Sequence, residues 1–165
     1  MSVVIVKKTS KEIIIGSDSI RVNGWTQEKD KKAKLWKIND DMILGFAGLC
    51  SIGTLFREWL KTNSPKINNE DGIIDFIIKF NGYLSDMDKD LKSDKSDFIF
   101  IYKKKIYYIE GFFVREIEDY YAIGAGMDYA LSALYLGHNV EKSIETACEL
   151  SVYCEKPINI IKIKL

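Results

Sequence analysis

The sequence predicts an α+β fold, built as a four-layer αββα sandwich of two antiparallel sheets packed face to face. Two observations predict it. Strand-like and helix-like segments occur in separate groups, in the order strands, two helices, strands, two helices, strand, and such grouping favours antiparallel sheets over an alternating parallel fold. Both helix pairs carry an apolar stripe that needs an apolar surface to cover. Two stacked sheets offer one outer face to each pair.

The first third of the chain is predicted to be mainly sheet. The polar residues 9–11 have the length of a hairpin turn. Asn23 and Gly24 form a second turn signal. Residues 39–41 are the polar turn of a third pair. The strands that these turns join are residues 3–8 with 12–16, a pair around 20–25, and 35–39 with 41–48.

The rest of the chain alternates between helical periodicity and strand composition. Apolar residues recur at helical spacing in four segments, and β-branched and aromatic residues dominate the others. Pro157 ends the last helix. The predicted helices are residues 49–60, 73–91, 128–137 and 140–153, and the predicted strands are 97–102, 105–113, 119–124 and 158–165.

Composition predicts one domain over residues 1–165, because 165 residues with 47% apolar content can bury a substantial core. Lys+Arg and Asp+Glu both total 24, so the summed field gives no reason to expect nucleic acid or anionic lipid as a partner. A net charge near zero favours self-association. Composition thus permits a homo-oligomer, and we expect no nucleic-acid partner and no membrane span.

The cysteines and the start of the chain predict a cytoplasmic location. Cys50, Cys148 and Cys154 are odd in number and lack a metal-type or paired spacing, which is typical of reduced thiols. The start lacks the basic and apolar regions of a signal peptide. The aspartates at residues 86–90 begin like a calcium loop, but Leu91 stands where glycine is required. We therefore expect no metal and no cofactor.

Ser2 combines, once Met1 is removed, a hydroxyl with a free α-amine. A small second residue is the usual condition for that removal. The two groups are the nucleophile and base of N-terminal covalent catalysis, and an α-amine with a pKa of roughly 7.7 to 8.0 can accept a proton near neutrality. A strand that begins at residue 3 would aim the attack. Serine after Met is common in proteins without such a function, so the hypothesis depends on the surrounding residues.

Those residues resemble a known family. Residues 2–18, "SVVIVKKTSKEIIIGSD", resemble the start of a mature proteasome-type β-subunit, especially the bacterial HslV peptidase, in which the nucleophile begins a strand-turn-strand that ends in an aspartate. Counted without a gap, Ser2 falls on the nucleophile, Asp18 on that aspartate and Lys34 on the catalytic lysine. Similar segments follow collinearly at residues 45–48 "GFAG", 55–60 "LFREWL", 121–134 "YAIGAGMDYALSAL" and 145–154 "ETACELSVYC".

The resemblance implies a site. Lys34 would lower the pKa of the Ser2 amine and hydroxyl through its positive charge, and Asp18 would hold that lysine charged and oriented. Gly48 is similar to the glycine whose backbone N–H binds the oxyanion in this family. Taken without the resemblance, Asp18 and Lys34 would be a surface ion pair.

The sequence departs from the family at two positions. Ala125 stands where a serine is common, and Glu149 where the family has an aspartate at a helix end. The family sometimes holds a monovalent cation through carbonyls of its last helix. Those positions would fall near Cys148, Ser151 and Cys154.

The resemblance implies a peptidase of the N-terminal nucleophile (Ntn) hydrolase type that acts through Ser2 within a homo-oligomeric ring or double ring. Its substrate would be a peptide or unfolded protein, and an unfolding ATPase is the implied partner. Two alternatives stay open: a catalytically inactive proteasome-like structural or interaction subunit, and an Ntn amidase acting on a small-molecule amide.

Overall fold

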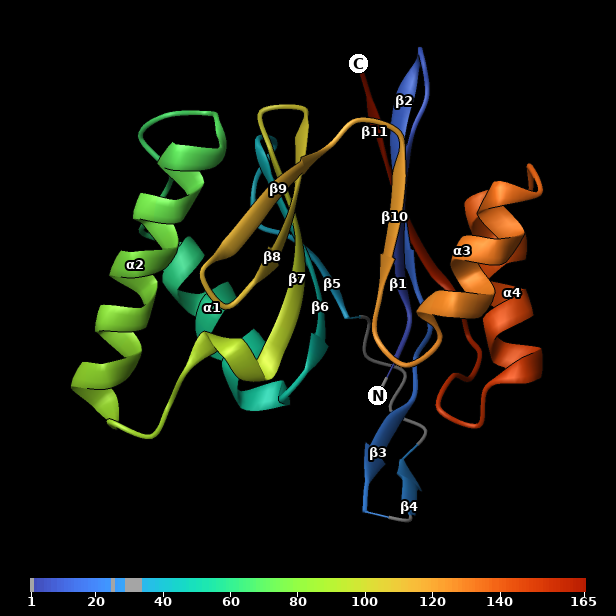
Figure 1. The fold of residues 1–165 in the computed structure, drawn as a ribbon, viewed down its shortest axis with the longest axis horizontal. Coiled ribbons are helices and arrows are strands. Elements are labelled where there is room, and N and C mark those ends of the chain that lie inside the picture. Colours follow the sequence, from blue (N-terminus) through green and yellow to red (C-terminus); the bar gives the residue numbers. More distant parts are fainter. Residues whose placement is uncertain (1, 25, 29–33) are drawn as a thin grey trace.

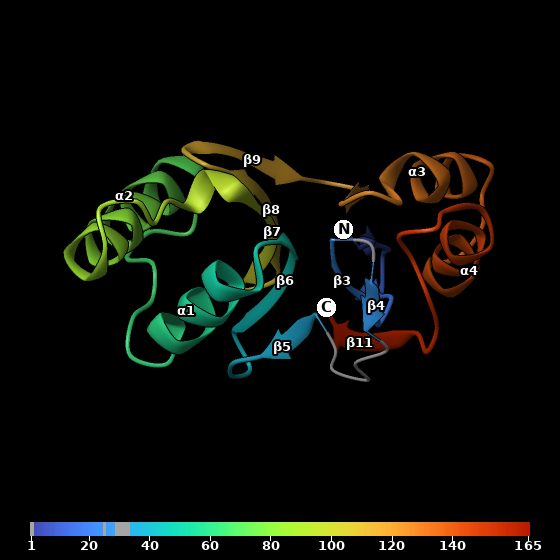
Figure 2. The same ribbon diagram turned by 90° about the horizontal axis from the view of Figure 1, so that it is seen from below.

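The computed structural model describes residues 2–24, 26–28 and 34–165, so Met1 and Trp25 lie outside it. It shows an α+β fold of four layers and confirms the predicted class (Figures 1 and 2). The strands are β1 (Val4–Lys8), β2 (Glu12–Ser17), β3 (Arg21–Asn23), β4 (Thr26–Glu28), β5 (Leu35–Lys37), β6 (Met42–Gly48), β7 (Ser96–Tyr102), β8 (Lys105–Glu110), β9 (Phe113–Ile117), β10 (Tyr120–Ile123) and β11 (Asn159–Lys164). The helices are α1 (Cys50–Leu60), α2 (Glu70–Met87), the 3-10 turn η1 (Ser93–Lys95), α3 (Met127–Tyr135) and α4 (Val140–Leu150).

The first strand lies in the interior of its sheet. The strand order is β10-β1-β2-β11, and all three pairings are antiparallel. Val4 pairs with Ile123 on one side and with Ser17 on the other. Because both edges of β1 are paired, the residue before it is held at a fixed place in the sheet.

The second sheet has the order β5-β6-β7-β8-β9, also antiparallel throughout. The β3–β4 hairpin is separate and projects below the sandwich in Figure 1. In Figure 2, α1 and α2 cover the outer side of the five-stranded sheet, and α3 and α4 cover that of the four-stranded sheet.

Three buried clusters fill the spaces between the four layers. The cluster between the sheets is mainly aliphatic, with Tyr108 as its one aromatic member among the described buried residues, and alternate residues of β1, β2, β6, β7 and β8 point into it. A second cluster lies under α1 and α2 and is rich in aromatic side chains. A third lies under α3 and α4 and consists of small and branched aliphatic side chains with Cys154. The apolar stripes of both helix pairs are therefore covered, as the sequence predicts.

Two helices begin at asparagine caps, whose side chains satisfy backbone donors of the first turn. Asn69 accepts from the Gly72 N–H at 2.9 Å, and Asn139 accepts from the Lys142 N–H at 2.8 Å. None of the helices in the described part of the chain is long and apolar enough to cross a membrane.

The structure corrects three predicted boundaries. The second helix ends at Met87, not near Leu91. Leu91 packs on the same cluster as the helix, but it does so from a loop. The last helix ends at Leu150 instead of continuing to residue 153. The predicted strand 105–113 is two strands, β8 and β9, joined at Gly111, whose φ of 57° suits a residue without a side chain.

Candidate active site

The chain segment around Ser2 is clamped from two sides. Ser2 is only 4% exposed. Its carbonyl accepts the Gly126 N–H at 3.1 Å, at the junction of β10 and α3. The next carbonyl, that of Val3, accepts the Asp18 N–H at 3.2 Å, at the end of β2. One clamp comes from the N-cap of α3 and the other from the residue after β2, so both the sheet and the start of α3 position Ser2.

Asp18 is fully buried and saturated with donors. Its Oδ1 accepts the Val3 N–H at 3.0 Å and lies 2.7 Å from Lys34 Nζ. Its Oδ2 accepts the N–H groups of Ile20 at 3.3 Å and Glu155 at 3.4 Å. Four donors thus converge on one buried carboxylate. The same carboxylate therefore connects the first strand, the lysine and the segment after α4.

Lys34 lies just before β5, and its side chain is 11% exposed, against 0% for that of Asp18. The alternative of a surface ion pair is wrong, because both partners are buried. Buried charges persist in proteins only when they are paired and hydrogen-bonded. Since Ser2 and Lys34 line the same cavity, the structure places the pair beside the residue proposed as nucleophile.

Gly48 ends β6 and lines the same cavity. Its φ is 126°, and a Cβ built on it would lie 2.6 Å from the Lys95 carbonyl oxygen and 2.7 Å from Ser96 Cα. No other residue fits without moving backbone. The position requires glycine, whereas its role as oxyanion donor stays a prediction.

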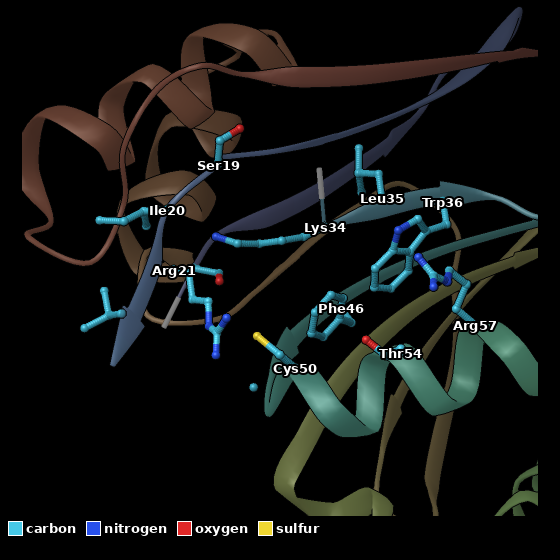
Figure 3. Close-up of a pocket in the computed structure, with 13 residues that line it drawn as sticks. Ser19, Ile20, Arg21, Lys34, Leu35, Trp36, Phe46, Cys50, Thr54 and Arg57 are labelled. Atoms are coloured by element: carbon cyan, nitrogen blue, oxygen red, sulfur yellow. The ribbon is translucent and has the colours of Figure 1, made fainter. Parts of the chain in front are cut away.

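The cavity has a volume of about 610 Å³ and lies between β3, β5, the end of β6 and α1. Figure 3 shows Ile20 and Arg21 on one side and Trp36, Thr54 and Arg57 on the other. The indole of Trp36 stacks on Phe46, with ring centroids 4.8 Å apart and an interplanar angle of 11°. The cavity thus combines an aromatic wall with charged side chains, next to Ser2.

The other positions that the resemblance singled out lie apart from this cavity. Ala125 and Glu149 are exposed. Cys154 is buried, and burial followed by the charge of Asp18 raises its pKa to about 11. The same two causes raise the pKa of Cys148 to about 12. These thiols are therefore neutral near pH 7. Ser151 is buried at the end of α4, and its Oγ accepts the Tyr153 N–H at 3.2 Å.

Among the described residues, no cluster of three or more His, Cys, Asp or Glu side chains could hold a metal ion. A cation held by backbone carbonyls near Cys148, Ser151 and Cys154 is suggested by the resemblance alone, and we predict no metal there.

Trp36, Phe46 and Arg57, which form one wall of the cavity, are not among the site residues predicted from the sequence. The pairing of β5 with β6 sets Trp36 opposite Leu44, which makes Phe46 its diagonal neighbour. The predicted turn at residues 39–41 sets this register, so it was a signal from which the contact between Trp36 and Phe46 could have been predicted. Arg57 comes from α1, and no spacing in the sequence shows that this helix brings it over Trp36.

The chain matches no known protein-family model, and no curated protein is similar enough in sequence to match it. Several solved structures do match. BPH of Thiobacillus denitrificans, solved alone and in complex with epoxomicin, superposes with a TM-score of 0.86 at 18% sequence identity, covering 99% of this chain and 98% of that chain. Eukaryotic HslV from Trypanosoma brucei superposes with a TM-score of 0.72 at 19% identity, covering 99% of both chains. The chain therefore has the HslV-like, proteasome-type Ntn-hydrolase fold that its sequence resemblance implied.

Proposed function

We propose that this protein is a proteasome-like peptidase that hydrolyses peptide bonds through Ser2 after removal of Met1. The observation that carries the proposal is the buried pair of Asp18 and Lys34, 2.7 Å apart, behind a cavity that Ser2 lines. Removing two charges from water gives little net stability. A buried, fully hydrogen-bonded pair at a cavity is thus better explained by chemistry than by folding.

In the first step, Ser2 Oγ attacks the carbonyl carbon of the scissile peptide bond while the α-amine of Ser2 accepts the hydroxyl proton. The positive charge of Lys34 lowers the pKa of both groups, which makes the amine a base suited to neutral pH. Asp18 holds the ammonium group in place. The Gly48 N–H donates to the oxyanion that develops on the carbonyl oxygen.

In the second step, the protonated amine gives its proton to the leaving nitrogen and the C–N bond breaks. The amine product departs and an ester joins the acyl half of the substrate to Ser2. Water then attacks this ester and gives a proton to the same amine. The C–O bond breaks, Oγ regains the proton, and the carboxylic acid product is released.

The proposed unit of assembly is one domain of residues 1–165, repeated in a homo-oligomeric ring or double ring and fed by an unfolding ATPase. The shared fold supports this assembly, and native mass spectrometry tests it by giving the number of subunits directly.

The test of the peptidase compares variants of Ser2 whose N-terminus is known. Intact mass first establishes that Met1 is absent, because a retained Met1 ties the amine up in a peptide bond. Hydrolysis of fluorogenic peptides is then expected in the wild type, to be lost in Ser2→Ala and kept in Ser2→Thr. Ser132→Ala is the matched control, since this serine on α3 is exposed and its hydroxyl donates only to the Asp128 carbonyl among the described side-chain contacts.

Three results would contradict the proposal. Quantitative retention of Met1 in the native host removes the base. Equal absence of turnover in the processed wild type and Ser2→Ala, for peptides and small amides alike, points to the structural subunit. Turnover of small amides without turnover of peptides points to the amidase.

Epoxomicin, which is bound in a BPH structure of the same fold, is expected to reduce peptide hydrolysis.

A further inference from the structure

The charged residues that line the cavity beside Ser2 are all cations. They are Arg21, Lys34 and Arg57, and no carboxylate is among the lining residues that the structure describes. Lys34 is engaged with Asp18, which is buried behind it. The two arginines are therefore the charged groups available to a substrate.

Arg57 is held in a fixed plane. Its guanidinium carbon lies 5.2 Å from the centroid of the Trp36 ring, so it extends the aromatic wall. Its Nε and Nη2 donate to Glu58 Oε1 at 3.0 and 2.7 Å. The described contacts leave Nη1 uncommitted. An arginine fixed in this way loses little side-chain entropy when it binds an anion.

Glu58 does not neutralise Arg57 fully, because it serves two cations. Its other oxygen lies 2.5 Å from Lys61 Nζ. The hydrogen bond from Lys61, followed by that from Arg57, lowers the pKa of Glu58, which keeps it ionised near neutrality. One carboxylate between two cations leaves a net positive charge.

Arg21 reaches the cavity from β3. Figure 3 shows it on the opposite side of Phe46 from Arg57. It contacts Glu28 through a single atom pair, Nη1 to Oε2, at 3.4 Å, and about half of its side chain is exposed. Within the described part of the chain, its Nε and Nη2 have no such partner and can donate to a ligand.

We infer that the cavity selects substrates with a carboxylate side chain on the acyl side of the scissile bond, with Arg57 as the specificity-determining residue and Arg21 as a second contact. The inference rests on the proposed peptidase function. A guanidinium binds a carboxylate through charge-assisted hydrogen bonds, and the Trp36–Phe46 wall contacts the methylene groups that carry it. Among the lining residues that the structure describes, a lysine or arginine side chain would meet only like charge, which disfavours it.

The experiment uses four fluorogenic peptides that differ only in the residue before the leaving amine: Glu, Gln, Leu or Lys. In the wild type, kcat/KM for the Glu peptide should exceed that for the Gln peptide by about tenfold, the effect of one hydrogen bond to a charged group. The Lys peptide should be the poorest of the four. In Arg57→Gln the Glu to Gln ratio should fall toward one, with Arg21 leaving a small preference, and in Arg57→Lys it should be intermediate because the charge remains without the planar fork.

Arg115→Gln is the matched control. Its guanidinium carbon also lies over an aromatic ring, 4.8 Å from the centroid of Tyr121, and the residue does not line the cavity. This variant should keep the wild-type ratios. A change as large as that of Arg57→Gln would show that the preference comes from overall charge and would overturn the inference.

The outcomes separate this inference from the proposed function. If peptides are hydrolysed but Leu is preferred and Arg57→Gln leaves the Glu to Gln ratio unchanged, the peptidase stands and the carboxylate preference is wrong. If no peptide is hydrolysed, the proposed function fails. Calorimetric titration of Ser2→Ala with the free Glu-ending and Gln-ending peptides then decides whether the cavity binds a carboxylate. Tighter binding of the Glu peptide by about tenfold, lost in the Arg57→Gln background, supports a carboxylate site. Equal or absent binding overturns it.

Discussion

The two helix–sheet layers of this protein are packed with different kinds of side chain. Under α1 and α2, the ring of Phe56 lies 4.4 Å from that of Phe80, 4.9 Å from Phe98 and 6.4 Å from Phe76, centroid to centroid. Under α3 and α4, the fully buried side chains of the described cluster are aliphatic, apart from Cys154. We call the first the aromatic layer and the second, with its smaller side chains, the thin layer.

The thin layer brings α4 and the segment after it close to the strand that carries Ser2. A Cβ on Gly16, in β2, would lie 2.6 Å from Ile144 Cδ1 of α4. A Cβ on Gly126 would lie 2.5 Å from Cys154 Sγ and 3.0 Å from Val3 Cβ. Because interiors of this density transmit small shifts, the thin layer fixes the position of Ser2, while the aromatic layer supplies more of the stability.

The largest expected effect on stability is in the aromatic layer. Phe80→Ala removes a fully buried ring that stacks on Phe56, and should lower the free energy of unfolding by about 3 to 5 kcal/mol. The cavity-lining residues that the structure describes include none from α2. Peptide hydrolysis per folded molecule should therefore change little. Urea unfolding and kcat/KM, corrected for the folded fraction, measure both quantities.

Tyr83→Ala is the control for this layer, since Tyr83 lies on the same helix and is only half-buried. Tyr83→Ala should therefore lower the free energy of unfolding by less than Phe80→Ala does. If the folded fraction of Phe80→Ala loses hydrolysis as strongly as a variant of the thin layer, the two layers do not differ in role.

Gly126→Ala, in the thin layer, is expected to have the converse effect, a smaller loss of stability and a larger loss of activity. The added methyl group would crowd Cys154 and Val3, which should cost about 1 to 3 kcal/mol. Since the Gly126 N–H holds the Ser2 carbonyl, the displacement also reaches the nucleophile. A misplacement of about 1 Å can cost about 100-fold in rate, so kcat/KM should fall more than the stability loss explains.

Two variants sharpen this test. Gly126→Ala combined with Cys154→Ala makes room for the methyl group and should recover part of the activity. Gly82→Ala, in α2 with no atom near its Cβ position, should keep activity and gain stability of about 0.5 to 1 kcal/mol. Activity loss in Gly82→Ala, or none in Gly126→Ala, would contradict the positioning role of the thin layer.

The layers themselves could be predicted from the sequence, because the period of the apolar residues identifies each strand and helix and shows which face must be covered. The residues at which the helices and strands end could not be predicted as well. Leu91 continues the apolar stripe of α2 and packs on the same cluster, yet it lies in a loop. Periodicity records which residues are buried and does not record whether the backbone between them is still helical.

In the site, too, some residues could be predicted from the sequence and others could not. Asp18 and Lys34 could be placed by counting along one strand pair from Ser2, because the family resemblance fixes their spacing, and the structure does pair them. Their catalytic roles stay a prediction. Arg57 and Trp36 meet only because α1 lies beside β5 in space. Specificity was thus harder to predict than the proposed chemistry, since it depends on segments that converge only in the folded chain.

The smallest expected effect concerns the face that the five-stranded sheet turns toward the other sheet. Asp97 in β7 lies directly opposite Glu110 in β8. Burial, followed by the charge of Glu110, raises the pKa of Asp97. The folded state therefore binds this proton more tightly than the unfolded state. Stability is lost as the pH rises through the ordinary aspartate range up to the raised pKa, and the penalty is complete above it.

Asp97→Asn removes this penalty and should stabilise the protein at pH 7 by about 0.2 to 1 kcal/mol, the range for like charges directly opposite in a sheet. Urea unfolding at several pH values should show the difference from wild type shrinking toward pH 3. Asp40 is the control of opposite sign, because the hydrogen bond and charge of Lys37 lower its pKa. Asp40→Asn should therefore lose stability relative to wild type as the pH rises. If Asp97→Asn is destabilising at pH 7, its carboxylate has a stabilising partner in solution, and the inner face of the five-stranded sheet, like the thin layer, is built for more than packing.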